Sequence, residues 1–252
     1  MIRFGVGPSG AGAGRQALRE RAAQVIGKAL GDTVEIRAFE KYSELDSAEL
    51  DLAWLPPILC LRAIERDHAV ILRVVREEGT LYHGAIFVPS SVPRYRPEDL
   101  RDLRIAWVDE SSCGGYLFPR AALYERDLDP DDLFREEKML DSHVAVVRAV
   151  KSGEVDCGAT YLNSRLDGST RAGWTSEAVV MRCILVSRPI PSDGICSRLE
   201  SSAEAKSGLL KLNESVAGVT ILRELFDAAR FEPQDVHHYD PVRSALDLMQ
   251  NR

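Results

Sequence analysis

Short apolar segments alternate along this chain with longer segments in which apolar residues recur every three or four positions. The short segments, rich in Val, Ile and Leu, are typical of strands, and the longer ones are typical of amphipathic helices. Strands separated by single helices favour parallel pairing in an α/β fold. The pattern predicts strands at residues 2–6, 33–39, 52–55, 69–75, 81–88, 103–108, 137–140, 155–161 and 178–186.

Helices are predicted between these strands and over most of the C-terminal fifth of the chain. Residues 201–249 are expected to be mostly helical, with breaks near Gly218 and at Glu232-Pro233, because Gly and Pro interrupt helices. The polar stretch from Asn163 to Thr175 is expected to be a surface loop. The other predicted helices cover residues 14–30, 58–66, 97–103, 116–126 and 143–152.

Composition narrows the class of protein. The chain has 252 residues, of which 45% are hydrophobic and 28% charged, as in ordinary globular proteins. The net charge is −7 and there is no basic run, which argues against a nucleic-acid partner. No segment reaches the 18 or more apolar residues of a membrane helix. The N-terminus lacks the features of a signal peptide, so the sequence as it stands indicates the cytoplasm, or the periplasm or cell surface if a signal has been removed.

The cysteines do not suggest a disulfide framework or a metal site. They are odd in number and widely spaced, with no C-x-x-C pair and no Cys/His spacing that suits zinc. We therefore expect mostly buried thiols in a reducing compartment, no metal and no cofactor. The five residues are Cys60, Cys113, Cys157, Cys183 and Cys196.

The segment Gly5-Val6-Gly7-Pro8-Ser9-Gly10 matches G-x-G-x-x-G between a strand and a helix. A dinucleotide-dependent oxidoreductase is one hypothesis from this match, with Glu40 as the ribose carboxylate. However, Pro8 stiffens the turn, and Glu40 lies farther away than the usual ~20 residues. The Lys of a phosphate-binding P-loop is also absent. The pattern favours a flexible turn that leads into a helix.

A second small-residue turn, Asp109 to Pro119, follows the strand at 103–108. It contains Ser111, Ser112, Cys113 and two glycines, and an apolar helical pattern begins there. The first N–H groups of a helix and the positive end of its dipole favour an anion. The turn has no Lys or Arg, so N–H and O–H dipoles would hold that anion. The alternative is an ordinary helix cap, for which Ser is common.

Cys113 also allows an enzymatic hypothesis. A thiol at a helix N-terminus can have a lowered pKa, and His143, at the start of a later predicted helix, would be its base. No third orienting group is evident in the sequence. A cytosolic enzyme that acts on a small anionic substrate through Cys113 and His143 therefore remains an alternative.

Several segments, in order along nearly the whole chain, resemble one family. In these segments the chain is similar to the phosphonate- and phosphite-binding components of ABC importers (PhnD-type), which have the type II periplasmic-binding-protein fold. Ser112–Pro119 resembles the family's S-T-S-G-[YF]-L-x-P motif, and Asp51-Leu52-Ala53-Trp54 resembles its V-D-x-A-W strand. The other segments are Leu81–Val88, Arg96–Leu100, Asp141–Asp156, Ile190–Asp193 and Tyr239–Val242.

The resemblance implies a ligand site. Ser112 and the N–H groups around Cys113 and Gly114 would hold phosphonate oxygens, and His143 would donate another hydrogen bond. Tyr82 would add its hydroxyl, and Asp193 would face a cationic amine of the ligand. The full set of expected ligand-binding residues is Trp54, Leu55, Tyr82, Ser111, Ser112, Cys113, Gly114, His143, Asn163 and Asp193.

The chain departs from the family pattern at four of these positions. Cys113 and Gly114 replace a Thr and a Ser, which removes two hydroxyl donors. Leu55 stands where the aminophosphonate binders have a Tyr, and Asn163 stands where they have a carboxylate. The loss of one of two acids weakens the case for an aminoalkylphosphonate.

The sequence therefore predicts a two-lobed α/β clamp in which each lobe is a mostly parallel sheet flanked by helices. Lobe one is expected to contain residues 1–84 and 189–252, and lobe two residues 85–188. We expect a small oxyanion of the phosphonate, phosphite or phosphate class to bind between the lobes and to stabilise a closed state. The protein would be a monomer that serves an ABC permease as its solute-binding component, or a related ligand sensor, without chemistry on the ligand.

Overall fold

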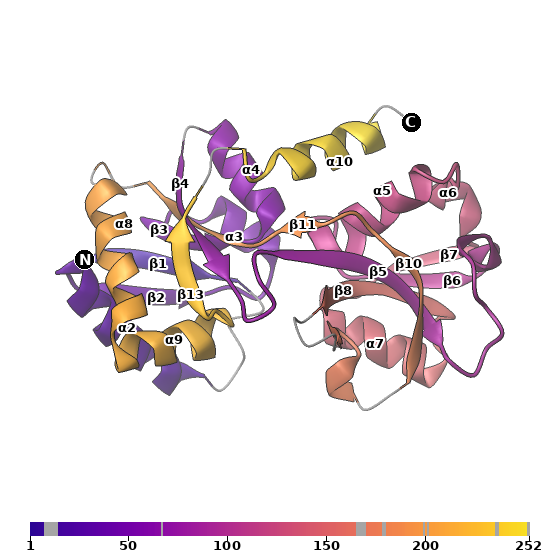
Figure 1. The fold of residues 1–252 in the computed structure, drawn as a ribbon, viewed down its shortest axis with the longest axis horizontal. Helices are drawn as coiled ribbons and strands as arrows, with labels where there is room; N and C mark the ends of the chain where they lie inside the picture. The colour runs from indigo at the N-terminus through magenta and orange to yellow at the C-terminus, as the bar shows by residue number, and fades with distance from the viewer. Residues whose placement is uncertain are drawn as a thin grey trace. The chain divides into compact units, whose positions relative to one another are not determined.

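The chain divides into two compact units, each built on its own sheet (Figure 1). The structure is a computed structural model that describes residues 1–7, 15–66, 68–164, 170–177, 180–198, 200, 202–234 and 237–250. Unit 1 contains Met1–Thr80 and Ser192–Tyr239, and unit 2 contains Leu81–Pro191 and Asp240–Arg252. The last helix, expected in lobe one, is thus grouped with the second unit.

The sheet of unit 1 has the strand order β13-β4-β12-β3-β1-β2. Strand β1 pairs in parallel with β2 and β3, whereas β12 runs antiparallel to both β3 and β4, and β13 antiparallel to β4. The carboxyl ends of β1 and β3 therefore meet at one edge of this sheet. The strand bounds are Ile2–Val6 (β1), Val34–Ala38 (β2), Leu52–Leu55 (β3), Ala69–Val75 (β4), Gly194–Ser197 (β12) and Arg230–Pro233 (β13).

Helices pack on both faces of the sheet of unit 1. Buried side chains of α2, α8 and α9 form the main core with alternate residues of the strands, such as Phe4 and Leu72. Helix α4 packs against β3, β4 and β12. The helices of this unit are Gln16–Leu30 (α2), Tyr42–Ser47 (α3), Pro57–Glu65 (α4), Ser202–Leu210 (α8), Lys211–Glu214 (η4, a 3-10 helix) and Val216–Phe226 (α9).

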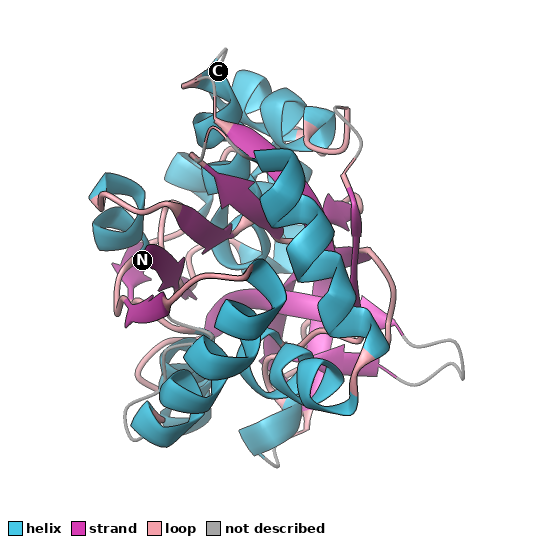
Figure 2. Ribbon diagram, turned by 90° about the vertical axis from the view of Figure 1, so that its left-hand side faces the viewer, coloured by secondary structure: helices cyan, strands magenta, loops and turns pink. Residues whose placement is uncertain are grey.

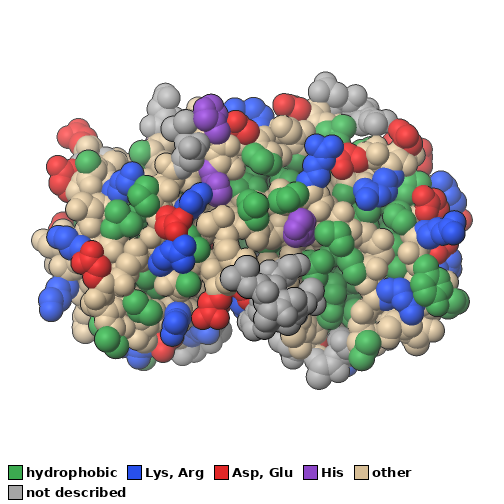
Figure 3. All heavy atoms as spheres, viewed as in Figure 1, with side chains coloured by type: hydrophobic (Ala, Val, Ile, Leu, Met, Phe, Trp, Pro, Cys, Tyr) green, Lys and Arg blue, Asp and Glu red, His purple; other side chains and the backbone are tan. Residues whose placement is uncertain are grey.

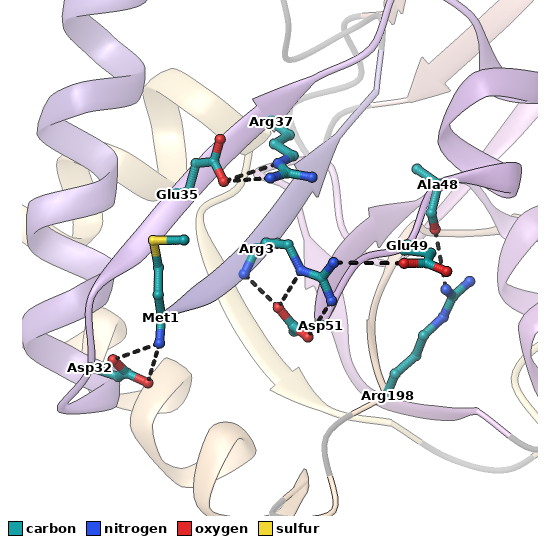
Figure 4. Close-up of polar contacts among 9 residues, drawn as sticks. All are labelled: Met1, Arg3, Asp32, Glu35, Arg37, Ala48, Glu49, Asp51 and Arg198. Carbon is teal, nitrogen blue, oxygen red and sulfur yellow. Dashed lines mark hydrogen bonds and ion pairs between the residues drawn. The ribbon is translucent and has the colours of Figure 1, made fainter.

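Ion pairs fix the N-terminal strand to its neighbours (Figure 4). The Arg3 guanidinium in β1 donates from Nε to Asp51 Oδ2 at 3.0 Å and from Nη2 to Asp51 Oδ1 at 3.1 Å. The same carboxylate accepts the Arg3 backbone N–H at 2.7 Å. These bonds hold the pKa of Asp51 below its usual value, with the Arg3 side-chain hydrogen bond as the main cause. The pair ties β1 to the residue that precedes β3.

The sheet of unit 2 has the order β10-β5-β8-β6-β7. Strand β6 is parallel to β7 and β8, whereas β5 is antiparallel to both β8 and β10. Two short strands extend the sheet, β11 beside β5 and β9 beside β8. The bounds are Leu81–Pro89 (β5), Arg104–Trp107 (β6), Glu136–Met139 (β7), Cys157–Ser164 (β8), Thr170–Ala172 (β9), Met181–Val186 (β10) and Ile190–Pro191 (β11).

The sheet of unit 2 separates two apolar cores. One core joins the strands to α5 and includes Trp107 and Leu123, and the other joins them to α7 and includes Phe87 and Val147. Figure 2 shows helices, coloured cyan, beside the magenta strands of the α/β fold. The helices are Pro97–Leu100 (η1), Cys113–Leu117 (η2, a π-helical turn), Phe118–Tyr124 (α5), Pro130–Leu133 (α6), His143–Ser152 (α7), Thr175–Glu177 (η3) and Asp240–Gln250 (α10).

The two-lobed α/β fold agrees with the sequence prediction, but both sheets are mixed rather than mostly parallel. Strand β5 follows β4 without an intervening helix, and β12 follows β11 in the same way. A strand that is not reached through a crossover helix does not have to be parallel to its neighbour. Strands β5 and β12, which follow these two passages of the chain from one unit to the other, each have antiparallel neighbours, and β13 and β9 add further antiparallel pairs.

Two local predictions differ from the structure, and a third falls mostly outside the described residues. Helix α9 begins after its N-cap Ser215 and runs through Gly218, where a side chain would collide with the Leu212 backbone. Gly218 therefore permits close packing and does not break the helix. The expected loop after Asn163 contains the end of β8 and strand β9, and residues 165–169 lie outside the described residues. Most of the glycine-rich turn, residues 8–14, also lies outside them.

Charged side chains of both signs are interspersed over the face shown in Figure 3. Within the described part of the chain, no helix is both long and apolar enough to cross a bilayer.

Candidate ligand-binding site

The small-residue turn of unit 2 is folded by its own hydrogen bonds. Asp109 Oδ1 accepts the N–H of Ser111 at 2.7 Å, and the Asp109 carbonyl accepts the N–H of Ser112 at 2.8 Å. The buried Ser112 then caps the next helix, because its Oγ accepts the N–H of Gly115 at 3.1 Å. The capping interpretation of this Ser is thus correct. It does not exclude ligand binding, since a hydroxyl that accepts one hydrogen bond still carries a proton to donate.

The turn places a helix N-terminus at the carboxyl end of strand β6. Helices η2 and α5 are continuous from Cys113 to Tyr124. The first N–H groups of a helix have no acceptor within the helix, and here Ser112 satisfies the one at Gly115. The preceding N–H groups, at Cys113 and Gly114, are where the positive end of the dipole lies. This is an arrangement that stabilises an anion.

Two glycines allow the chain to pack closely around this helix start. A Cβ on Gly84 of β5 would lie 2.7 Å from Pro119 Cδ and 2.8 Å from the carbonyl oxygen of Gly114. A Cβ on Gly114 would lie 3.1 Å from Tyr82 Cε2 and 3.3 Å from Tyr161 Cβ. The structure therefore brings Tyr82, Gly114 and Tyr161 together. A Ser at 114 would supply a hydroxyl, whereas Gly114 allows close approach of the Tyr82 ring and of Tyr161 Cβ.

His143 is the first residue of α7, which begins after the N-cap Ser142. Its Nδ1 lies 2.8 Å from Thr160 Oγ1, and its ring meets the ring of Tyr161 edge-on with centroids 5.0 Å apart. The surrounding protein removes water from the half-buried imidazole and lowers its pKa from 6.5 to about 4. His143 is therefore neutral at pH 7 and has one ring N–H to donate.

Strand β8 contributes residues that the sequence did not single out. Thr160 is fully buried beside His143, and Gly173 lies so close to it that a side chain at 173 would collide with its hydroxyl. Tyr161 links His143 to Gly114. Asn163, which is 6% exposed, follows two residues later on the same face of β8, and its Oδ1 has no hydrogen-bond partner among the residues that the structure describes. The period of two along a strand is the signal that would have paired Tyr161 with Asn163.

The three remaining candidates belong to unit 1. Trp54 lies in the main core, edge-on to Phe226 with centroids 6.2 Å apart. The buried Leu55 ends β3, and its carbonyl accepts the Cys60 thiol at 3.3 Å. Asp193 is 8% exposed and forms an ion pair with Arg76. Sequence reasoning did not identify Arg76, because nothing local connects it to a residue 117 positions away.

The cysteines are not bridged to one another. All five lie among the described residues, and none forms a disulfide with another. Burial raises the pKa of Cys183 to about 11 and that of Cys196 to about 12, and it also raises the pKa values of Cys60 and Cys157. Within the described residues, no three His, Cys, Asp or Glu side chains are grouped so that they could hold a metal ion.

The amino-acid sequence matches the model of one protein family over residues 4–239. The family is described as "ABC transporter, phosphonate, periplasmic substrate-binding protein". The match covers both units.

Three solved structures with similar folds share less than a fifth of their residues with this chain. The binding-protein component of an ABC phosphonate transporter from Pseudomonas aeruginosa is 19% identical, with a TM-score of 0.78, over 99% of this chain and 86% of that one. PhnD1 from Prochlorococcus marinus, in complex with methylphosphonate, is 18% identical, with a TM-score of 0.78, over 100% and 98%. XAC2383 from Xanthomonas citri, bound to ATP, is 18% identical, with a TM-score of 0.76, over 99% and 97%.

Proposed function

The chain belongs to the family of periplasmic substrate-binding proteins of phosphonate ABC transporters, and from this premise we propose that it binds a small oxyanion of the phosphonate, phosphite or phosphate class. The observation that carries the proposal is the helix start at Cys113, which is capped by the buried Ser112 and lies close to Tyr82. The methylphosphonate bound to the relative from Prochlorococcus marinus is consistent with this ligand class.

Each group proposed at the site would donate a hydrogen bond to the oxyanion. The N–H groups of Cys113 and Gly114 and the hydroxyl of Ser112 would bind its oxygens. The neutral imidazole of His143 would donate from Nε2, which requires Nδ1 to accept the proton of the Thr160 hydroxyl 2.8 Å away. Hydrogen bonds to a charged partner are stronger than those between neutral groups. Such a site would bind an anion without an Arg or Lys.

The residues of unit 1 would complete the site in different ways. The side chain of Leu55 would give an apolar contact to the substituent on phosphorus. Trp54 lies in the core, so we propose that it supports strand β3 rather than contacting the ligand directly. The buried Asn163 of unit 2 would accept a hydrogen bond from a protonated ligand oxygen, because its Oδ1 has no partner within the described part of the chain.

Binding would serve transport. We propose that the protein, acting as a monomer, delivers the oxyanion to an ABC permease after ligand contacts in both units have stabilised a closed form.

Isothermal titration calorimetry tests the ligand class directly. Methylphosphonate, phosphite, phosphate and sulfate are titrated separately into the full chain. We expect saturable binding of at least one of the three phosphorus oxyanions and weaker binding of sulfate. If none of the three binds, the proposed function is wrong.

The double variant Ser112→Ala/His143→Ala tests the proposed donors. Hydrogen bonds to a charged group are worth about 1.5–3 kcal/mol each, so the affinity should fall at least about a hundredfold. Ser112→Ala also removes a helix cap, and Ser215→Ala is the matched control. Ser215 Oγ accepts the Gly218 N–H at 3.0 Å in unit 1, away from the proposed donors. The control should lose a similar amount of stability and keep its affinity, whereas unchanged affinity in the double variant would refute the assignment.

A further inference from the structure

Asp193 lies at the edge of the unit 1 sheet where a ligand is expected. It directly precedes β12, whose first residue Gly194 pairs with Leu55 at the carboxyl end of β3. In open α/β sheets, ligands bind beyond the carboxyl ends of the parallel strands. A carboxylate at this edge would be the natural partner of a positively charged group on a ligand.

In this chain the carboxylate already has a partner. The Arg76 guanidinium donates from Nη2 to Asp193 Oδ2, and the side chains of the pair are only 18% and 11% exposed. The N–H of Val74 donates to the backbone carbonyl of Asp193 at 2.8 Å, which holds the residue beside β4. The exposed Asp227 lies 3.7 Å from Arg76 Nε. Arg76 is thus fixed by two carboxylates of its own unit.

The ion pair with Arg76 changes how Asp193 can interact with a ligand. An incoming ammonium group would have to displace the guanidinium from Asp193 and leave that largely buried charge to the exposed Asp227, 3.7 Å away, which is costly. An oxyanion without an amine does not have to break this ion pair.

We propose that Arg76 is a specificity-determining residue, and that it restricts this site to oxyanions without a cationic amine. The ligands favoured are methylphosphonate, phosphite and phosphate, and those disfavoured are aminoalkylphosphonates. The proposal rests on the proposed function and adds to it the charge of the substrate.

The test compares two probes that differ by an aminomethyl group. Methylphosphonate and 2-aminoethylphosphonate are titrated calorimetrically into the wild-type protein and into Arg76→Leu. We expect the wild type to bind methylphosphonate at least about tenfold more tightly. Arg76→Leu releases the Asp193 carboxylate, and the ratio of the two affinities should shift toward 2-aminoethylphosphonate by at least about tenfold.

Two further variants distinguish a shift in the ratio of the two affinities from a general loss of structure. Arg73→Leu is the matched control, because it removes an ion pair from strand β4, between Arg73 Nη2 and Glu232 Oε2 at 2.7 Å, and leaves Asp193 paired. It should keep the wild-type ratio. The double variant Arg76→Leu/Asp193→Asn should return the ratio toward the wild-type value, because the released charge is gone.

The outcomes separate a failure of the proposed function from a failure of the role proposed for Arg76. If the wild type binds neither phosphonate, phosphite nor phosphate, the proposed function fails. If it binds 2-aminoethylphosphonate as tightly as methylphosphonate, or if Arg76→Leu folds and keeps the wild-type ratio, the role of Arg76 is refuted while the proposed function stands. If Arg76→Leu does not fold, the wild-type ratio alone decides.

Discussion

A neutral imidazole has a single N–H, and which nitrogen carries it decides what the ring can do. Because the pKa of His143 is about 4, the ring is neutral throughout the physiological pH range, and the position of its single proton therefore matters. Thr160 is the side chain within hydrogen-bond distance of Nδ1, and it is fully buried. If Thr160 donates, the proton of the ring lies on Nε2 and is directed away from Thr160. Thr160 would then influence the ligand only through His143.

Thr160→Val should therefore weaken methylphosphonate binding without removing any atom that touches the ligand. We expect about a tenfold loss of affinity, the usual effect of one hydrogen bond. Thr160→Ser, which keeps the hydroxyl, should bind like the wild type. The ¹⁵N chemical shifts of the His143 ring give the tautomer directly: Nε2–H in the wild type and a mixture in Thr160→Val. A purely structural role for Thr160 would leave that tautomer unchanged.

The stability of the protein should depend on pH through His143. The unfolded chain binds a proton on this His near pH 6.5, whereas the folded chain does so only near pH 4, so stability falls as the pH drops from 6.5 toward 4. One pKa unit corresponds to about 1.4 kcal/mol, and with partial exposure we expect about 2 kcal/mol of loss between pH 7 and 4.5. Urea unfolding of the wild type and of His143→Gln at both pH values measures it. An equal loss in both proteins would contradict the shift.

For single residues, the sequence pointed to those whose type and position suggest a role, but it did not identify the residues that contact them in the folded chain. Ser112 and Gly114 were singled out because small residues at a helix start are typical of caps and of anion sites, and their role in ligand binding stays a prediction. Arg76 and Thr160 were not, since charged and hydroxyl residues are common. Their significance depends on which residue lies beside them in the folded chain.

Among the elements, those with a strong local pattern were predicted best. The predicted bounds of β1, β3, β4 and α7 coincide with the observed ones. Strand β12 was missed because it has four residues, Gly-Ile-Cys-Ser, with little strand propensity. It is a strand because it lies between β3 and β4 and is buried at every position. Tertiary packing determines whether so short a segment becomes a strand, and the local sequence alone does not contain that information.

The approach of η2 to strand β5 depends on Gly84. Gly84→Ala would place a methyl group within 3 Å of Pro119 and of the Gly114 carbonyl, so the helix start must move. We expect a stability loss of about 1–3 kcal/mol and a clear loss of methylphosphonate affinity. Gly208→Ala is the control, because its methyl group would lie 2.8 Å from the Ala29 carbonyl in unit 1. It should cost stability and leave the affinity unchanged; equal affinity losses in the two variants would contradict a specific role for Gly84.

For the molecule as a whole, the proposed mechanism requires that the ligand binds to both units. Small-angle X-ray scattering with and without methylphosphonate tests this requirement. The radius of gyration should decrease when saturating ligand is added, because contacts in both units favour a closed form. The Ser112→Ala/His143→Ala variant should not respond. An unchanged radius in a wild-type protein that binds the ligand would mean that one unit alone carries the site.

The grouping of α10 with unit 2 has a consequence for the order in which the protein is made. Unit 1 lacks β12 and β13 until the segment Ser192–Tyr239 has been synthesised, and unit 2 lacks α10 until residues 240–250 follow. That helix packs on α5 and buries Val242 completely. Domains generally fold as units on the ribosome, the N-terminal one first. Here the N-terminal half contains neither unit in full: unit 1 is complete only after Tyr239 has been added and unit 2 only after α10 has followed, so no N-terminal unit can finish folding early.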